Sequence, residues 1–352
     1  MRGLSLLVAA ALGALLAGAP VDLPVARASR TNARPDTMSV DRVRRGMKGY
    51  GLTVFEGTTP ERFGVEVIDV LKNYMPAQDL ILIKTDHPRL DVAKTVAGMS
   101  GSPIFIDGKM IGAYSYGWDF GSEPVAGVTP IENMLDELDR PLPREIFGWP
   151  LELLPPSRTR PPKAPAAVPK PPLKTRPLSN ANRFEGKPGE YRLDRHAAQL
   201  AANSPASVAA SLHARALSTP LLIGGFGRLA TSMAREWFAP LGLEPLAAGG
   251  GGLGVEAGSP EHFEDGGSLG IGLVRGDINA MPLGTVTRIE GDRLVAFGHP
   301  MMSAGVTALP TAIARVSWVL ASEQSSQKIA HAVRPLGALV SDRQASVVVS
   351  ES

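Results

Sequence analysis

The fold of this chain is decided by Gly98-Met99-Ser100-Gly101-Ser102-Pro103. Two short apolar runs follow, Ile104-Phe105-Ile106 and residues 109–116, and Asp107-Gly108 separates them. Asp-Gly between apolar runs favours a type I′ turn, in which both central residues take positive φ. The pattern therefore predicts a tight turn that exposes Ser100 and leads into a β-hairpin. The backbone N–H groups of such a turn converge on one point and can hold an oxyanion.

Short apolar runs separated by turn signals surround this hairpin and indicate a mainly β chain. Strands are expected at residues 52–55, 65–71, 80–83 and 125–129, and Pro130 suits the first turn of a brief helix. Further along, helices are expected at residues 196–202, 208–217 and 229–241, and strands at residues 269–274, 284–289 and 293–297.

Composition divides the chain into six parts. They are a signal peptide at residues 1–28, a flexible lead-in at 29–45, a serine-bearing half at 46–154, a Pro-rich and basic linker at 155–190, a helical and Gly-rich segment at 191–267, and a histidine-bearing β half at 268–352. The linker combines recurrent prolines with basic residues, which favours an extended spacer. Because the sequence ends on the strand-like Val347-Val348-Val349, we expect intact relatives to extend further.

The first residues have the layout of a secretory signal peptide. Met1-Arg2 precedes an apolar run at residues 4–19, and Ala26-Arg27-Ala28 supplies a cleavage site. The run is shorter than the roughly 20 apolar residues of a membrane span. We therefore expect export across the cytoplasmic membrane, to the periplasm, the cell envelope or the medium. The chain has no cysteine, so its stability there would come from packing alone.

The charge balance gives no sign of a nucleic-acid partner. Lys and Arg total 36 against 34 Asp and Glu, and no basic patch is interleaved with aromatic residues. No His, Asp or Glu pair has a zinc-ligand spacing such as H-E-x-x-H, so neither a metal nor another cofactor is expected.

A serine hydroxyl becomes a useful nucleophile when a base takes its proton, and histidine is the usual base. Among six histidines, His299 is the best candidate, because it follows a predicted strand within Gly298-His299-Pro300. The alternative is a turn histidine with no chemical role. His196 and His213 lie on predicted helices and fit surface or packing roles better.

The order of these elements resembles the active-site end of chymotrypsin-like peptidases. There the strand after the nucleophile hairpin lines the substrate pocket and a C-terminal helix follows, and Gly127-Val128-Thr129 and the helix from Ile131 match that continuation here. Ser115-Tyr116-Gly117 would pair with an extended substrate by strand addition. Several motifs resemble the SpoIVB serine peptidase family over about residues 46–138 and 268–349. These are Gly51-Leu52-Thr53-Val54-Phe55, Val65-Glu66-Val67-Ile68, the stretch from Gly98 to Pro103, Gly127-Val128-Thr129-Pro130, Gly284-Thr285-Val286-Thr287 and Ala296-Phe297-Gly298-His299-Pro300.

The resemblance implies an exported serine endopeptidase with Ser100 as nucleophile and His299 as general base. Gly98, Met99 and Gly101 would form the turn that holds the oxyanion. In the sporulation enzyme that founded the family, an Asp-Pro-Arg-Leu-like run supplies the acid. Here the run reads Asp86-His87-Pro88-Arg89-Leu90, so Asp86 is the first choice and Asp342 the second.

The histidine segment precedes the serine segment in the sporulation enzyme and follows it here. We therefore expect a permuted chymotrypsin-like double β-barrel with a helical insertion and a Pro-rich linker, because a triad depends on position in space and not on chain order. The expected partner is a protein or peptide substrate, such as the extracytoplasmic part of a membrane protein. The alternative function is a non-catalytic binding or scaffold protein on a peptidase-like fold.

Overall fold

The computed structural model describes residues 34–118, 121–141, 214–248, 254–323 and 325–351. The predicted signal peptide, the linker and the helix at residues 196–202 lie outside these residues. The chain separates into a unit of residues 1–35 and a unit of residues 36–352, and everything below concerns the second unit. No helix among the described residues is long and apolar enough to cross a membrane.

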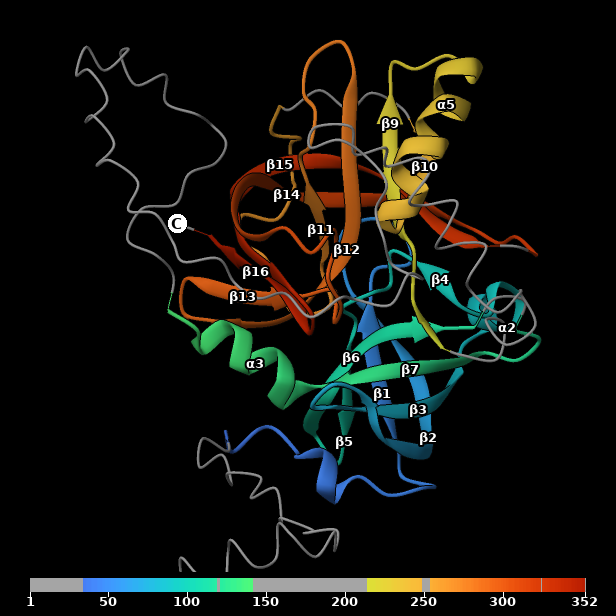
Figure 1. Cartoon of the computed structure of the whole chain (residues 1–352), viewed down its shortest axis with the longest axis vertical. Helices are drawn as coiled ribbons and strands as arrows, with labels where there is room; N and C mark the ends of the chain where they lie inside the picture. The colour runs from blue at the N-terminus through green and yellow to red at the C-terminus, as the bar shows by residue number, and fades with distance from the viewer. Residues whose placement is uncertain (1–33, 119–120, 142–213, 249–253, 324, 352) are drawn as a thin grey trace, which may run out of the picture. The chain divides into compact units, whose positions relative to one another are not determined.

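The serine-bearing half forms a closed antiparallel barrel of six strands, coloured blue to green in Figure 1. In ring order they are β5 (Pro103–Ile106), β1 (Lys48–Thr53), β2 (Glu61–Met75), β3 (Gln78–Asp86), β7 (Val125–Pro130) and β6 (Lys109–Gly117). Closure leaves no free sheet edge within the ring. The turn at Asp107 and Gly108 has positive φ at both residues, as the Asp-Gly signal predicted.

The histidine-bearing half forms a second ring of six antiparallel strands, coloured orange to red in Figure 1. In ring order they are β12 (Asn279–Glu290), β11 (Ser268–Ile271), β14 (Gly305–Leu320), β15 (Ser326–Arg343), β16 (Ser346–Ser350) and β13 (Arg293–Ala296). Two further strands, β9 (Thr219–Gly224) and β10 (Leu243–Ala247), extend this sheet from β12. The prediction of a mainly β double barrel is confirmed.

The remaining elements are short and connect the barrels. They are the 3-10 turns η1 (Val40–Arg42) and η4 (Ala239–Leu241), the helices α2 (Pro88–Ala93), α3 (Ile131–Asp139) and α5 (Arg228–Phe238), and the two-residue strands β4 (Val96–Ala97) and β8 (Arg215–Ala216). The helices predicted after Pro130 and at residues 229–241 are present as α3 and α5. The prediction of a helix over residues 208–217 is wrong in its described part, because Arg215 and Ala216 form β8 against β6.

Each barrel has its own apolar core, and a third cluster joins the two. Helix α3 buries Ile131, Met134, Leu135 and Leu138, the spacing of one helical face. This face packs against Met110 and Ala113 of β6 and against Val295, Val340 and Val348 of the second barrel. The helix therefore ties the serine-bearing barrel to the histidine-bearing barrel. Strand β4, which leads to the nucleophile turn, pairs with β15 and makes a second tie.

Candidate active site

Ser100 lies in the turn between β4 and β5. The turn is tight because Gly98 and Gly101 both have positive φ, at +93° and +101°. Gly101 also packs directly against the second barrel: a Cβ there would lie 1.9 Å from the carbonyl oxygen of Thr285. Only glycine allows this approach, so the turn that carries Ser100 is held against β12.

His299 follows β13, after a sharp change of backbone direction at Phe297 and Gly298, both with positive φ. Its ring reaches across to the nucleophile turn, where Nε2 lies 2.8 Å from the Oγ of Ser100. These residues are 199 positions apart and belong to different barrels. The structure thus brings together the predicted nucleophile and the predicted base.

The protonation of this pair follows from its contacts. Nδ1 of His299 lies 2.8 Å from the carbonyl oxygen of Pro300, which can only accept, so Nδ1 carries the hydrogen and donates it. Nε2 is then free to accept the hydrogen of the Ser100 hydroxyl. Burial lowers the pKa of His299, while the Pro300 carbonyl and the charge of Asp342 oppose the shift. A neutral imidazole facing a serine hydroxyl is the resting state of a general base.

The prediction that Asp86 orients His299 does not agree with the geometry. Asp86 is exposed at the end of β3, whereas both ring nitrogens of the buried His299 are engaged by Ser100 and Pro300. The Asp-His-Pro run instead starts α2, because Nδ1 of His87 accepts a hydrogen bond from the N–H of Arg89 at 3.2 Å. The His87 ring also stacks on Phe55, which fixes the helix start.

Asp342, the second choice for the acid, is buried in β15 and binds the loop after His299. Its Oδ1 accepts a hydrogen bond from the N–H of Met301 at 2.7 Å. Its Oδ2 accepts from Met302 at 2.8 Å and from Ala304 at 3.0 Å. The carboxylate therefore shapes the loop that carries the Pro300 carbonyl. Asp342 is a positioning residue, and the group that touches Nδ1 is a backbone oxygen.

Three buried threonines hold the two barrels together around the dyad. Thr285 and Thr287 of β12 donate their hydroxyl hydrogens to the carbonyls of Gly98 and Gly101, at 2.9 and 2.6 Å. Thr129 of β7 donates to the carbonyl of Gly298 at 2.5 Å. No role was predicted for these threonines from the sequence. A signal was present, because Thr285 and Thr287 are two positions apart on one strand and therefore lie on the same face.

The three predicted turn residues differ in what they can offer an oxyanion. The N–H of Met99 donates to the carbonyl of Val96, and the N–H of Gly101 donates to the carbonyl of Tyr114. Both donors are committed within the fold, so the prediction that they face a substrate is not supported. The N–H groups of Gly98 and Ser100 are the better candidates for this role.

The predicted substrate strand Ser115-Tyr116-Gly117 is the last part of β6 and lies beside the dyad. A Cβ placed on Gly298 would lie 2.8 Å from the Cβ of Ser115. The Ser115 hydroxyl is shared with Thr129 at 2.8 Å, so it serves the fold. The Ser115 carbonyl accepts a hydrogen bond from the N–H of Leu217 at 3.0 Å. Contrary to the expected exposed serine, Ser100 is only 1% exposed, and His299 is equally buried.

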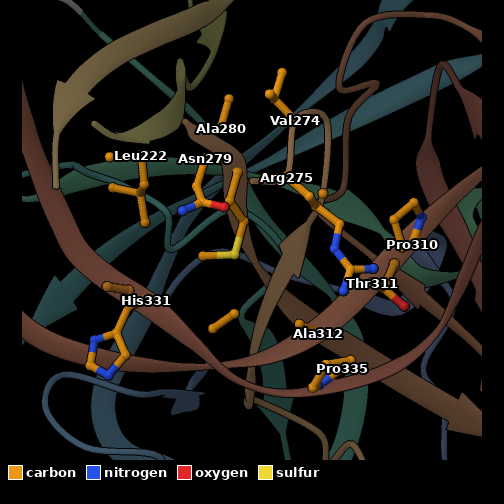
Figure 2. A pocket seen from close by; sticks show the side chains of 15 residues that line it. Leu222, Val274, Arg275, Asn279, Ala280, Pro310, Thr311, Ala312, His331 and Pro335 are labelled. Carbon is orange, nitrogen blue, oxygen red and sulfur yellow. The ribbon is translucent and has the colours of Figure 1, made fainter. Parts of the chain in front are cut away.

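A separate pocket opens on the second barrel, between β9, β12, β14 and β15 (Figure 2). Its lining is mostly apolar, with Arg275, Asn279 and His331 among the polar side chains. Neither Ser100 nor His299 lines it. Within the described ranges, no group of three His, Cys, Asp or Glu side chains could hold a metal ion.

Two antiparallel barrels with a serine and a histidine joined across them define the chymotrypsin-like class of serine peptidases. Residues 27–135 match the family described as SpoIVB peptidase S55, a family of serine peptidases. This match confirms the resemblance predicted from the motifs for the serine-bearing part of the chain. No curated protein and no solved structure matches the chain significantly.

Proposed function

We propose that the chain is an exported serine endopeptidase that cleaves protein substrates with Ser100 and His299. The observation that carries the proposal is the 2.8 Å contact between Ser100 Oγ and His299 Nε2, across two barrels and within a buried seam. A contact of this length is within the range at which a base takes a hydroxyl proton directly. The family match supports the same class of activity.

The mechanism has two halves. Ser100 Oγ attacks the peptide carbonyl while His299 Nε2 takes the hydroxyl proton, and the tetrahedral oxyanion receives hydrogen bonds from the N–H groups of Gly98 and Ser100. When the C–N bond breaks, His299 gives its proton to the leaving amine and an acyl-serine remains. A water molecule then attacks this ester, with His299 again taking and returning one proton. The Pro300 carbonyl stabilises the imidazolium in both halves.

The substrate binds as an added strand. The Ser115-Tyr116-Gly117 backbone lies beside the dyad and is paired with the short strand β8, and an extended peptide that replaces β8 can pair with the same groups. This mode of binding depends on the peptide backbone and suits an unfolded or exposed segment of a protein, such as an extracytoplasmic segment of a membrane protein. The signal-peptide-like start of the sequence supports an extracytoplasmic location.

The test compares the full chain with Ser100→Ala and, as a matched control, with Ser39→Ala at an exposed serine. We expect proteolysis of an unfolded protein substrate and covalent labelling by a fluorophosphonate in the wild type and in Ser39→Ala. We expect Ser100→Ala to lose both while melting at the same temperature. Proteolysis that survives in Ser100→Ala would reject the assignment of the nucleophile.

The burial of the dyad favours a second candidate function, a binding protein that keeps a peptidase fold without turnover. In that case no variant that uncovers Ser100 would react with the fluorophosphonate. The two functions are therefore separated by fluorophosphonate labelling of a variant in which Ser100 is accessible.

A further inference from the structure

A segment from beyond the Pro-rich linker adds a strand to the first barrel at the predicted substrate position. Ala216 pairs with Tyr116 and Arg215 pairs with Gly117, in antiparallel register. The next residue continues the pairing, because the N–H of Leu217 donates to the carbonyl of Ser115 at 3.0 Å. Residues 214–217 thus bind the strand that would receive a substrate.

Both ends of this segment are held by specific contacts. The carbonyl of Ala214 accepts a hydrogen bond from the Tyr74 hydroxyl at 2.5 Å, and the Ala214 methyl is buried beside Tyr116 and Leu80. At the other end, the Leu217 side chain lies over Gly117: a Cβ on Gly117 would lie 2.7 Å from Leu217 Cδ2. The same Cβ would lie 3.1 Å from the Cγ2 of Thr95. An aliphatic side chain therefore fills a site that the missing side chain of Gly117 leaves open.

The position of Leu217 relative to the dyad follows from the backbone. In an extended strand, the N–H and C=O of one residue point to the same side. The Leu217 N–H donates to the Ser115 carbonyl, so an extended Leu217 would direct its own carbonyl to the side of β6. Ser115 adjoins Gly298, the residue before His299, and Tyr114 binds the nucleophile turn through its carbonyl and N–H. In this register the peptide bond after Leu217 is the one that would face Ser100.

We propose that residues 214–217 are a built-in pseudosubstrate, and that the site takes an extended peptide with an aliphatic residue immediately before the cleaved bond. The proposal rests on the proposed function of the same site. A strand bound at this position would also explain why Ser100 is buried, because it occupies the predicted substrate strand next to the dyad. The proposal also defines a subsite for the Leu217 side chain, formed by Thr95 and Gly117. Because the segment belongs to the same chain, it competes with substrates at a high effective concentration.

The experiment measures the rate at which a fluorophosphonate labels Ser100 in the full chain. Leu217→Asp places a charge in the aliphatic subsite and should speed labelling at least tenfold. Leu229→Asp is the matched control, since Leu229 is 77% exposed on α5; it should label at the wild-type rate. Leu217→Ala removes only part of the side chain, so its labelling rate should lie between those of the wild type and Leu217→Asp. Because it adds no charge, it tests the proposal even if Leu217→Asp misfolds.

A free peptide with the sequence of residues 212–219 supplies the second measurement. It should slow the labelling of Leu217→Ala, and a peptide with Asp in place of the second Leu should not. Cleavage of the first peptide between its Leu-Ser residues, seen by mass spectrometry, supports the register, and cleavage elsewhere in it overturns the register. Equal labelling of all variants overturns the pseudosubstrate and leaves the peptidase intact. No labelling and no cleavage in any variant overturns the proposed function itself.

Discussion

His299 donates its Nδ1 hydrogen to the carbonyl of Pro300, and Asp342 fixes the loop that carries this carbonyl. A carboxylate in direct contact would stabilise the imidazolium more strongly, but it would also raise the pKa of the histidine further. Here the charge of Asp342 acts at longer range, and burial keeps the pKa of His299 below its ordinary value. The base therefore stays neutral and ready at pH values at which a free histidine is already protonated.

Asp342→Asn should weaken both stability and turnover. An amide cannot accept three hydrogen bonds from N–H donors in the same geometry, and its own NH₂ faces donors, so we expect a loss of about 2 kcal/mol or more in the free energy of unfolding. Displacement of the Pro300 carbonyl should lower kcat about tenfold or more, with KM little changed. Denaturant unfolding and steady-state peptide hydrolysis measure the two effects.

The pH profile separates this role from a purely structural one. In the wild type the acid limb of kcat/KM should lie below pH 6.5, because activity needs neutral His299 and burial lowers its pKa. Removing the charge of Asp342 removes an influence that raises this pKa, so the limb should move to lower pH in Asp342→Asn. Asp277→Asn, at an exposed aspartate, is the control and should leave the profile in place. A limb that moves to higher pH in Asp342→Asn would contradict the argument.

The sequence was sufficient to single out Ser100 and His299, which the structure brings into contact, because each stands beside glycines that a sharp turn requires. It could not identify the partner of Nδ1, because a backbone carbonyl has no side-chain signature. It offered Asp342 as an alternative acid, yet the three N–H groups that this carboxylate binds come from a loop some 40 positions earlier. Spacing alone does not predict such a contact.

Among the elements, local patterns predicted the hairpin at Asp107-Gly108 and the helices α3 and α5 well, since turn chemistry and amphipathic spacing decide them. The helix predicted over residues 208–217 is wrong at its described end, residues 214–217, for the opposite reason. Its alanine-rich and leucine-containing sequence has high helix propensity, but pairing with β6, the burial of Ala214 and the partial burial of Leu217 decide the conformation of its end. Long-range pairing of this kind leaves no local signal.

The contact between the nucleophile turn and β12 can be tested with two glycines of similar conformation. Gly108→Ala forces a residue with a Cβ into φ +71° with nothing within 4 Å of the new atom, so we expect a cost of about 1 kcal/mol. Gly101→Ala adds a clash with the backbone of Thr285 and Phe297, and we expect a loss of more than about 3 kcal/mol together with the activity. Thermal unfolding of the two variants measures the difference. Equal costs would show that the turn is not held against β12.

At the scale of the whole molecule, Lys328 links the two barrels, and the charge of its amine affects the stability of the fold. This residue of β15 is fully buried, and its Nζ donates to the Thr53 hydroxyl at the end of β1, at 2.8 Å. Thr285 of β12 lies 3.5 Å away. The Lys328 side chain also packs beside Gly98, below the nucleophile turn. Burial lowers the pKa of Lys328 to about 7.

The stability of the protein should therefore rise with pH above neutrality. Between about pH 7 and the ordinary lysine pKa near 10.4, the folded amine is mostly neutral while the unfolded amine still binds a proton. Because the unfolded state binds more protons, the free energy of unfolding increases with pH, by at most about 1.4 kcal/mol per unit. As pH falls toward 7 this stability is lost, and below 7 the folded state carries a buried charge.

Lys328→Met should remove this dependence, because it fills the same space with a side chain that does not titrate. We expect the difference in free energy of unfolding between the wild type and Lys328→Met to climb from pH 7 to pH 10, measured by urea titration at each pH. Lys48→Met is the matched control: its side chain is 76% exposed, so its curve should run parallel to that of the wild type. A difference that stays flat over this range would mean that Lys328 remains charged in the fold. The group that links β15 to Thr53 would then be a buried ammonium. The fold would carry the free-energy cost of this buried charge at every pH at which Ser100 and His299 are active.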